Sequence, residues 1–204
     1  MICIREDARG NAMPEPTVDI EYEKLRREYF AEPLVSNERL AEMKRILLCE
    51  IDGEACDYKN LYLASAIAMD LCSWEEALVL TEKWLSSIGH LIHPNWVLTK
   101  VKEWRIACNL RLGREGTVAE LLPALEADYL ADTMRDHGLD GLEEPMELDA
   151  PNAIAAAAMA IDVSQEIAKG ILKLVHASNW TNNYPQLMAK LNRINSGCCG
   201  NPGI

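Results

Sequence analysis

The residues whose type and spacing could carry chemistry are mostly acidic and gather in one segment. Between Glu126 and Asp149 there are nine acidic residues and one basic residue, Arg135, so this segment carries 1 − 9 = −8 of the formal net charge of −12. The acidic residues are Glu126, Asp128, Asp132, Asp136, Asp140, Glu143, Glu144, Glu147 and Asp149. Carboxylates at this density attract either a basic protein surface or a hard cation.

Three of these carboxylates share one face of a predicted helix. Asp128, Asp132 and Asp136 are spaced i, i+4, i+8, and each like-charge pair at this spacing destabilises an isolated helix by about 0.2–0.5 kcal/mol. Asp136 also lies near the predicted C-terminus, where the helix dipole disfavours an anion. A basic partner or a cation would relieve this repulsion. The alternative is a solvated face that only keeps the protein soluble.

A metal site is a second interpretation of the same residues. Asp132 and Asp136, with His137 beside them, offer the oxygen ligands that Mg²⁺ prefers. All-α phosphohydrolases and prenyl-transfer enzymes use such aspartate pairs, but they need a second acidic helix facing the first. Glu75, Glu76 and Glu82 are available, and nothing in their spacing selects them. We therefore assign no metal ligand, cofactor or catalytic residue, and keep a small metal-dependent hydrolase using Asp132 and Asp136 as an alternative.

The remaining reactive side chains form no recognisable site. His90 and His93 are expected in a loop, and the adjacent Cys198 and Cys199 in the C-terminal tail. The chain shows no phosphate-binding loop, nucleophile elbow or metalloprotease motif. Most of its five tryptophans are expected in the core. Any that is exposed in a groove would make a good binding anchor, and we take Trp96 and Trp104 as candidates.

Composition narrows the class of protein. An acidic chain without a Lys/Arg-rich run is not expected to bind nucleic acid or an anionic membrane directly. The longest apolar stretch, around residues 153–161, is too short to span a bilayer. Seven cysteines, an odd number scattered mostly through apolar stretches, indicate reduced and mostly buried thiols, and hence a cytoplasmic protein.

Helical periodicity recurs along the chain, and no segment alternates as a strand does. We predict an all-α fold of about eight helices in antiparallel hairpins, either a helical stack or a compact bundle. The predicted helices cover residues 18–31, 38–51, 58–72, 74–88, 95–112, 117–137 and 152–177, with a short one after Asn183. They form one domain, 17–195, between a flexible arm, 1–16, and a flexible tail, 196–204. Met13 is as good a start of translation as Met1.

The helix ends are predicted from local signals. Ser73 and Thr117 each precede a glutamate by three residues and form possible capping boxes. Gly113 is placed to end a helix. The alanine run 155–158 favours close helix contact.

Residues 60–127 resemble two tetratricopeptide-like helical hairpins. Small and apolar residues occupy the packing positions of such a repeat, namely Leu61, Ala64, Ser65, Ala68, Trp74 and Ala77. The best local match is the run 74–78, and residues 112–113 and 124–126 resemble the turn and end of a second repeat. Trp84, Arg105 and Thr117 depart from the pattern, and the two capping boxes are 44 residues apart rather than 34.

This resemblance implies a helical stack that binds proteins or peptides. Together with the charge pattern it favours a non-catalytic interaction protein, such as an adaptor, a chaperone or an immunity protein that inhibits a toxin. The expected partner is a basic protein. The candidate contact residues are Asp128, Asp132, Asp136, Asp140, Glu143, Glu144, Trp96 and Trp104. A further alternative is a helical subunit of a larger assembly that uses its alanine-rich helix, and the sequence does not determine the oligomeric state.

Overall fold

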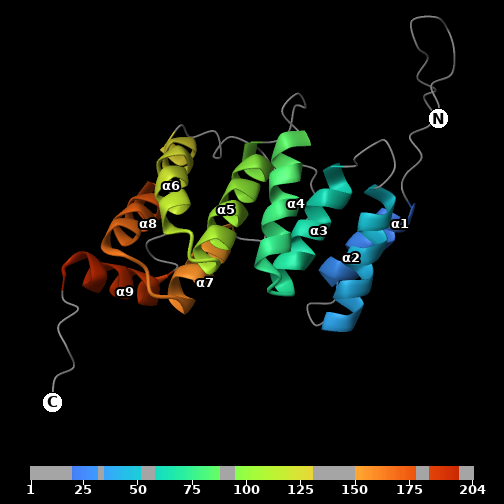
Figure 1. Ribbon diagram of the computed structural model, residues 1–204, viewed down its shortest axis with the longest axis horizontal. Coiled ribbons are helices and arrows are strands. Elements are labelled where there is room, and N and C mark those ends of the chain that lie inside the picture. Colours follow the sequence, from blue (N-terminus) through green and yellow to red (C-terminus); the bar gives the residue numbers. More distant parts are fainter. Residues whose placement is uncertain are drawn as a thin grey trace, which may run out of the picture.

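The computed structural model describes residues 20–31, 35–51, 58–87, 95–130, 150–177 and 184–197. Within these ranges all regular structure is α-helical, which confirms the predicted all-α fold. The described helices are α1 (Ile20–Ala31), α2 (Asn37–Ile51), α3 (Tyr58–Asp70), α4 (Trp74–Ser87), α5 (Asn95–Arg111), α6 (Glu115–Leu130), α7 (Ala150–Ala160), α8 (Gln165–Ala177) and α9 (Pro185–Asn195). They lie in a row from α1 and α2 at one end to α8 and α9 at the other (Figure 1).

The prediction of one helix over residues 152–177 is wrong. The chain leaves the helix after Ala160 and enters α8 at Gln165. Ser164 caps the start of this second helix. Its hydroxyl accepts a hydrogen bond from the amide of Ile167 at 3.4 Å, and its carbonyl accepts one from the amide of Ala168 at 2.9 Å. Serine favours such a cap over a helix interior, so a signal for the break was present within the predicted helix.

The predicted capping box at Thr117 is also wrong. Helix α6 begins two residues earlier, at Glu115, and the amide of Val118 donates to the carbonyl of Arg114 at 3.1 Å. Thr117 is an exposed residue inside the first turns of α6. The end of that helix beyond Leu130, predicted to reach His137, lies outside the described residues.

The turns α3–α4 and α5–α6 have the same backbone structure. Four amide-to-carbonyl bonds of 2.9–3.0 Å define them: Cys72 to Met69 and Ser73 to Ala68 in the first, Gly113 to Leu110 and Arg114 to Asn109 in the second. This is the Schellman pattern, with a left-handed residue after each helix. Its φ is 56° at Cys72 and 69° at Gly113, so the predicted stop at Gly113 is confirmed.

The hairpins therefore repeat at a spacing different from that of the predicted capping boxes. The equivalent residues, each directly before the second helix of its hairpin, are Ser73 and Arg114, which are 41 positions apart. At Ser73 the helix start is as predicted, but its amide donates to Ala68 and the carboxylate of Glu76 contacts Lys44 instead of reaching back.

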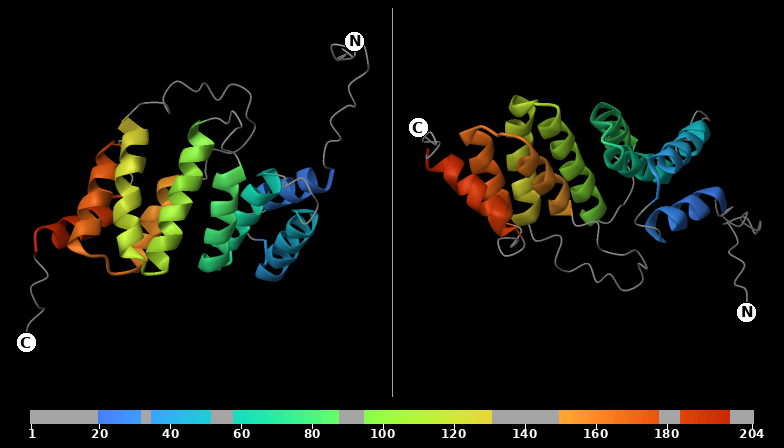
Figure 2. Two further views of the ribbon diagram at one scale, coloured as in Figure 1. Left: turned by 45° about the horizontal axis from the view of Figure 1, so that its top comes forward. Right: turned by 90° about the horizontal axis from the view of Figure 1, so that it is seen from below.

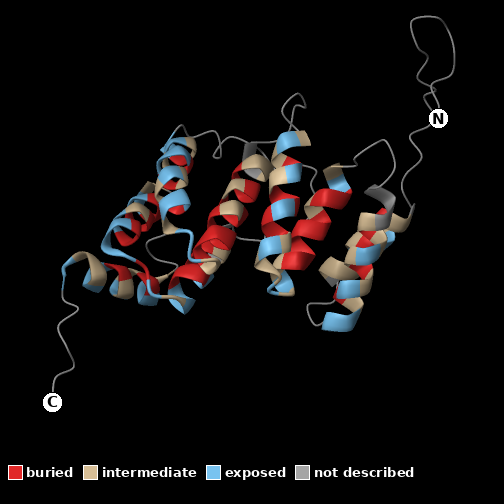
Figure 3. Ribbon diagram, in the orientation of Figure 1, coloured by how far each residue is buried: buried red, intermediate tan, exposed pale blue. Residues whose placement is uncertain are grey.

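The apolar side chains form two cores that share α5. Figure 3 shows the buried residues along α3, α4 and α5. Val101, Trp104 and Cys108 face the N-terminal core, which α1 to α4 complete. Ile106, Ala107 and Leu110 face the C-terminal core, formed with α6 to α9. Because these sets lie on different sides of a 3.6-residue helix, α5 is buried on two faces.

The hairpins stack regularly on one side of α5 only. Helix α5 packs beside α7 and α6 beside α8 (Figure 2), and the contact is so close that a Cβ atom at Gly170 would lie 2.6 Å from Cδ1 of Leu122. Ala155, Ala157 and Ala158 are buried in this C-terminal core. On the other side α4 packs on α5 without packing along α6, which leaves a groove between them.

Candidate interaction surface

A groove of about 770 Å³ lies between α4 and the start of α6, over α5. Its lining consists of Glu75, Leu78, Val79, Glu82, Lys83, Ser86 and Ser87 of α4, Asn109 of α5, and Arg114 and Thr117 at the start of α6. Val79 is 54% exposed there, an unusually large value for an aliphatic side chain of this protein. The lining thus combines apolar, charged and hydroxyl-bearing side chains.

Three ion pairs join α4, α5 and the start and body of α6. Arg114 Nη2 lies 2.8 Å from Glu75 Oε2, and Arg105 Nε lies 2.6 Å from Glu82 Oε1. The third pair joins Lys102 Nζ to Asp128 Oδ2 at 2.6 Å. All three are partly exposed, so each stabilises the fold by at most about 1 kcal/mol. Their main consequence is that these carboxylates have cationic neighbours within the chain.

The structure places two of the predicted contact residues within the helical framework. Asp128 is on α6 and pairs with Lys102, with its side chain 31% exposed. Trp104 is 4% exposed and its ring centroid lies 4.9 Å from that of Tyr62. It is a core residue, as expected for most of the tryptophans, and in this conformation offers no surface to a partner.

The side chains of the other predicted contact residues lie outside the described part of the chain. Trp96 belongs to the first turn of α5, and its side chain lies outside the described residues. The rest also lie outside them, namely Asp132, Asp136, Asp140, Glu143 and Glu144. The aspartate pair of the metal alternative is among them. Within the described ranges, no group of three or more His, Cys, Asp or Glu side chains could hold a metal ion.

The net charge is divided unevenly between the described helices and the rest of the chain. The described residues contain 17 Lys and Arg and 17 Asp and Glu, so their formal charge is zero. The remaining positions contain 3 basic and 15 acidic residues, or −12. Residues 131–149, which connect α6 to α7, hold seven acidic residues and one basic residue and carry half of that charge.

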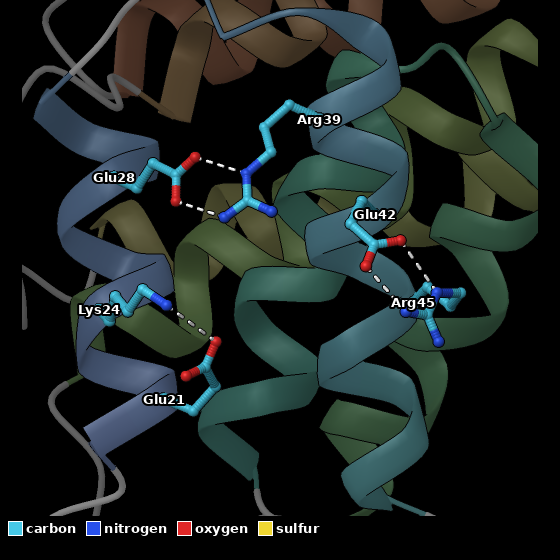
Figure 4. A network of polar contacts seen from close by, with 6 residues as sticks. All are labelled: Glu21, Lys24, Glu28, Arg39, Glu42 and Arg45. Carbon is cyan, nitrogen blue, oxygen red and sulfur yellow. Dashed lines mark hydrogen bonds and ion pairs between the residues drawn. The ribbon is translucent and has the colours of Figure 1, made fainter.

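Many charges of the helices are neutralised by ion pairs, as α1 and α2 illustrate (Figure 4). Arg39 donates to both carboxylate oxygens of Glu28, at 2.5 and 2.6 Å, and this hydrogen bonding lowers the pKa of Glu28. On α2, Arg45 donates to Glu42 at 2.8 and 3.0 Å and likewise lowers its pKa. The described helices therefore balance their own charge, and the acidic surplus belongs to residues outside the described ranges.

Sequence reasoning missed two basic residues of α5 that form ion pairs with α6 and α4. Lys102 and Arg105 are three residues apart on α5, and this spacing was the available sign that they share a face. Their partners are 26 and 23 residues away in sequence, so the pairs exist only once the hairpins have packed.

The two thiols whose side chains are described differ in burial. Cys108 is fully buried in the N-terminal core, and burial raises its pKa to about 12. Cys72 is exposed at the α3–α4 turn. The expectation of a buried thiol therefore holds for Cys108 and fails for Cys72.

Comparisons with known proteins give no relative for this chain. No protein-family model, curated protein or solved structure matches it, and the tetratricopeptide resemblance stays a prediction. Among the described helices, none combines the length and apolar character needed to cross a bilayer.

Proposed function

We propose that this protein is a non-catalytic interaction protein that binds a basic protein partner through its acidic segment after α6. The observation that supports this proposal is the division of charge. The described helices sum to zero, while residues 131–149 carry −6 over nineteen positions. Residues 131–149 thus hold a large local excess of carboxylates, and such an excess speeds the approach of a cationic surface and disfavours anionic ones.

The contact residues of this proposal are Asp132, Asp136, Asp140, Glu143 and Glu144. Asp128 is a less direct contributor, because Lys102 already neutralises part of its charge. Binding of this kind should depend on salt, since exposed charges are screened beyond about 8 Å at physiological ionic strength. An adaptor, a chaperone and an immunity protein would all share this behaviour.

The test is affinity capture from a lysate of the producing organism, followed by titration of the purified captured partner. Neutralising Asp140→Asn, Glu143→Gln and Glu144→Gln together should slow association by about tenfold or more, because charges at the rim of an interface act mainly on the association rate. Added salt should slow association of the unmodified protein in the same direction.

A matched control carries the same charge change elsewhere. Glu120, Asp162 and Glu166 are exposed on the helical framework, and replacing them by Gln, Asn and Gln also adds three to the net charge. This control should associate at the wild-type rate. An equal decrease in association rate in both variants, or binding that persists at high salt, would contradict the proposal. A rise in melting temperature on adding Mg²⁺ or Mn²⁺ would instead favour the metal-dependent alternative.

A further inference from the structure

Helix α4 presents a short stripe of exposed residues along the groove. Glu75, Val79 and Lys83 are spaced i, i+4, i+8, and all three are exposed and line the groove. Residues at this spacing lie one above the other on the same face of a helix. The stripe therefore has a negative end, an apolar centre and a positive end, with its charges about 6 Å before and after Val79 along the helix axis.

Such a stripe is complementary to itself when reversed. If two copies of α4 lie antiparallel about a two-fold axis through Val79, Glu75 of each copy faces Lys83 of the other, and the two Val79 side chains face each other. A two-fold interface of this kind uses the same patch on both subunits, so every contact is made twice. One stripe of three residues thus supplies two opposite-charge contacts and one apolar contact.

These side chains remain accessible within the described part of the chain. Val79 is 54% exposed. Lys83 forms no ion pair with any described residue, and the side chain of Glu75 is 69% exposed although it pairs with Arg114. Nη2 of Arg114 already donates to both carboxylate oxygens of Glu75, at 2.9 and 2.8 Å. Because each carboxylate oxygen has a second acceptor site, Glu75 can also accept from a second cation.

We propose that the α4 stripe is a homodimerisation surface, with a second copy of this chain docking antiparallel at the mouth of the groove. The charge pattern favours a second copy over a partner with one sign of charge, because such a partner would match one end of the stripe and repel the other. The proposal does not rest on the acidic segment. The contact is small, so we expect a dimer that forms and dissociates with concentration rather than an obligate one.

Charge reversal tests the pairing. By sedimentation velocity or light scattering across a concentration series, the wild-type protein should shift from monomer to dimer. Glu75→Lys places lysine opposite Lys83 of the partner subunit, and Lys83→Glu places glutamate opposite Glu75 of the partner subunit. Each variant should dimerise about tenfold or more weakly, since like charges facing each other oppose association.

Mixing the two single variants is the decisive step. In an equimolar mixture, one subunit carries two lysines and the other two glutamates, so the heterodimer regains both opposite-charge contacts. The mixture should therefore dimerise although neither variant does so alone. The matched controls Glu120→Lys and Lys173→Glu change exposed charges elsewhere and should leave the wild-type association unchanged. Circular dichroism checks that all variants remain helical.

Several results would overturn the proposal. The wild-type protein remaining monomeric up to its solubility limit would exclude a homodimer at this face. A mixture that stays monomeric, or reversal variants that dimerise as strongly as wild type, would show that α4 is not the contact. Loss of association in the controls as well would point to a general effect of charge. Failure of the basic-partner proposal would affect none of these measurements.

Discussion

Two equivalent turns place different residues in the same left-handed backbone conformation. Cys72 and Gly113 both follow a helix with positive φ and complete the same pair of hydrogen bonds. Glycine adopts this region without strain, whereas a residue with a Cβ atom is destabilised there by roughly 1–2 kcal/mol. The protein therefore combines a relaxed turn at Gly113 with a strained one at Cys72.

This difference predicts opposite effects of two substitutions. Cys72→Gly should raise the free energy of unfolding by about 1 kcal/mol, and Gly113→Ala should lower it by about 1 kcal/mol. A Cβ atom at position 113 meets no other atom within 4 Å, so the loss would come from the backbone alone. Urea denaturation followed by circular dichroism measures both changes. A stabilising Gly113→Ala would contradict this account.

At the scale of elements, a lysine of α9 completes the C-terminus of α7. Lys190 Nζ donates to the carbonyls of Ala158 at 2.8 Å, Met159 at 3.1 Å and Ile161 at 2.5 Å. The last carbonyls of a helix lack intrahelical donors and carry the negative end of the dipole. Lys190 therefore stabilises the end of α7. Periodicity alone had predicted that this helix continues to residue 177.

Removing this ammonium group should loosen α7. Lys190→Met keeps most of the apolar stem, and we expect it to lower the free energy of unfolding by about 1–2 kcal/mol. Lys173→Met on the exposed face of α8 is the control and should change it by less than about 0.5 kcal/mol. Chemical denaturation measures both, and equal effects would show that the contact with α7 contributes nothing.

At the scale of the whole molecule, α5 connects two cores whose other buried residues come from different helices, α1 to α4 in one and α6 to α9 in the other. Leu47 and Leu191 are fully buried, one in the N-terminal and one in the C-terminal core. Because α5 contributes to both clusters, loss of one core removes support from the other. We therefore expect the helices to unfold together rather than as two units.

Cavity-forming substitutions test this coupling. Leu191→Ala should destabilise the protein by about 2–5 kcal/mol, and the tryptophan signal should shift with it, although Trp84 and Trp104 lie in the other core. The unfolding transitions followed by fluorescence and by circular dichroism should coincide. Both midpoints should lie at a lower urea concentration than in the wild-type protein. Leu47→Ala should give the same pattern. A tryptophan transition left at the wild-type midpoint in Leu191→Ala would show two independent units.

Local sequence signals determined much of the fold and less of the candidate surface. Periodicity and the stop at Gly113 predicted most helices because these signals act within one or two turns of the chain. Ser164 as a cap and Arg114 as the start of α6 were harder, because a longer periodic run and a nearby Thr–Glu pattern competed with them.

The tertiary structure alone decided which charges are paired and where the groove lies. Lys102 and Asp128 are distant in sequence, and no periodicity specifies that partnership. The groove exists because α6 packs closely on α8 but not along α4, which depends on how whole hairpins stack. The acidic character of residues 131–149 and the Glu75, Val79, Lys83 spacing were in the sequence from the start. That this stripe faces open space required the packing of distant helices.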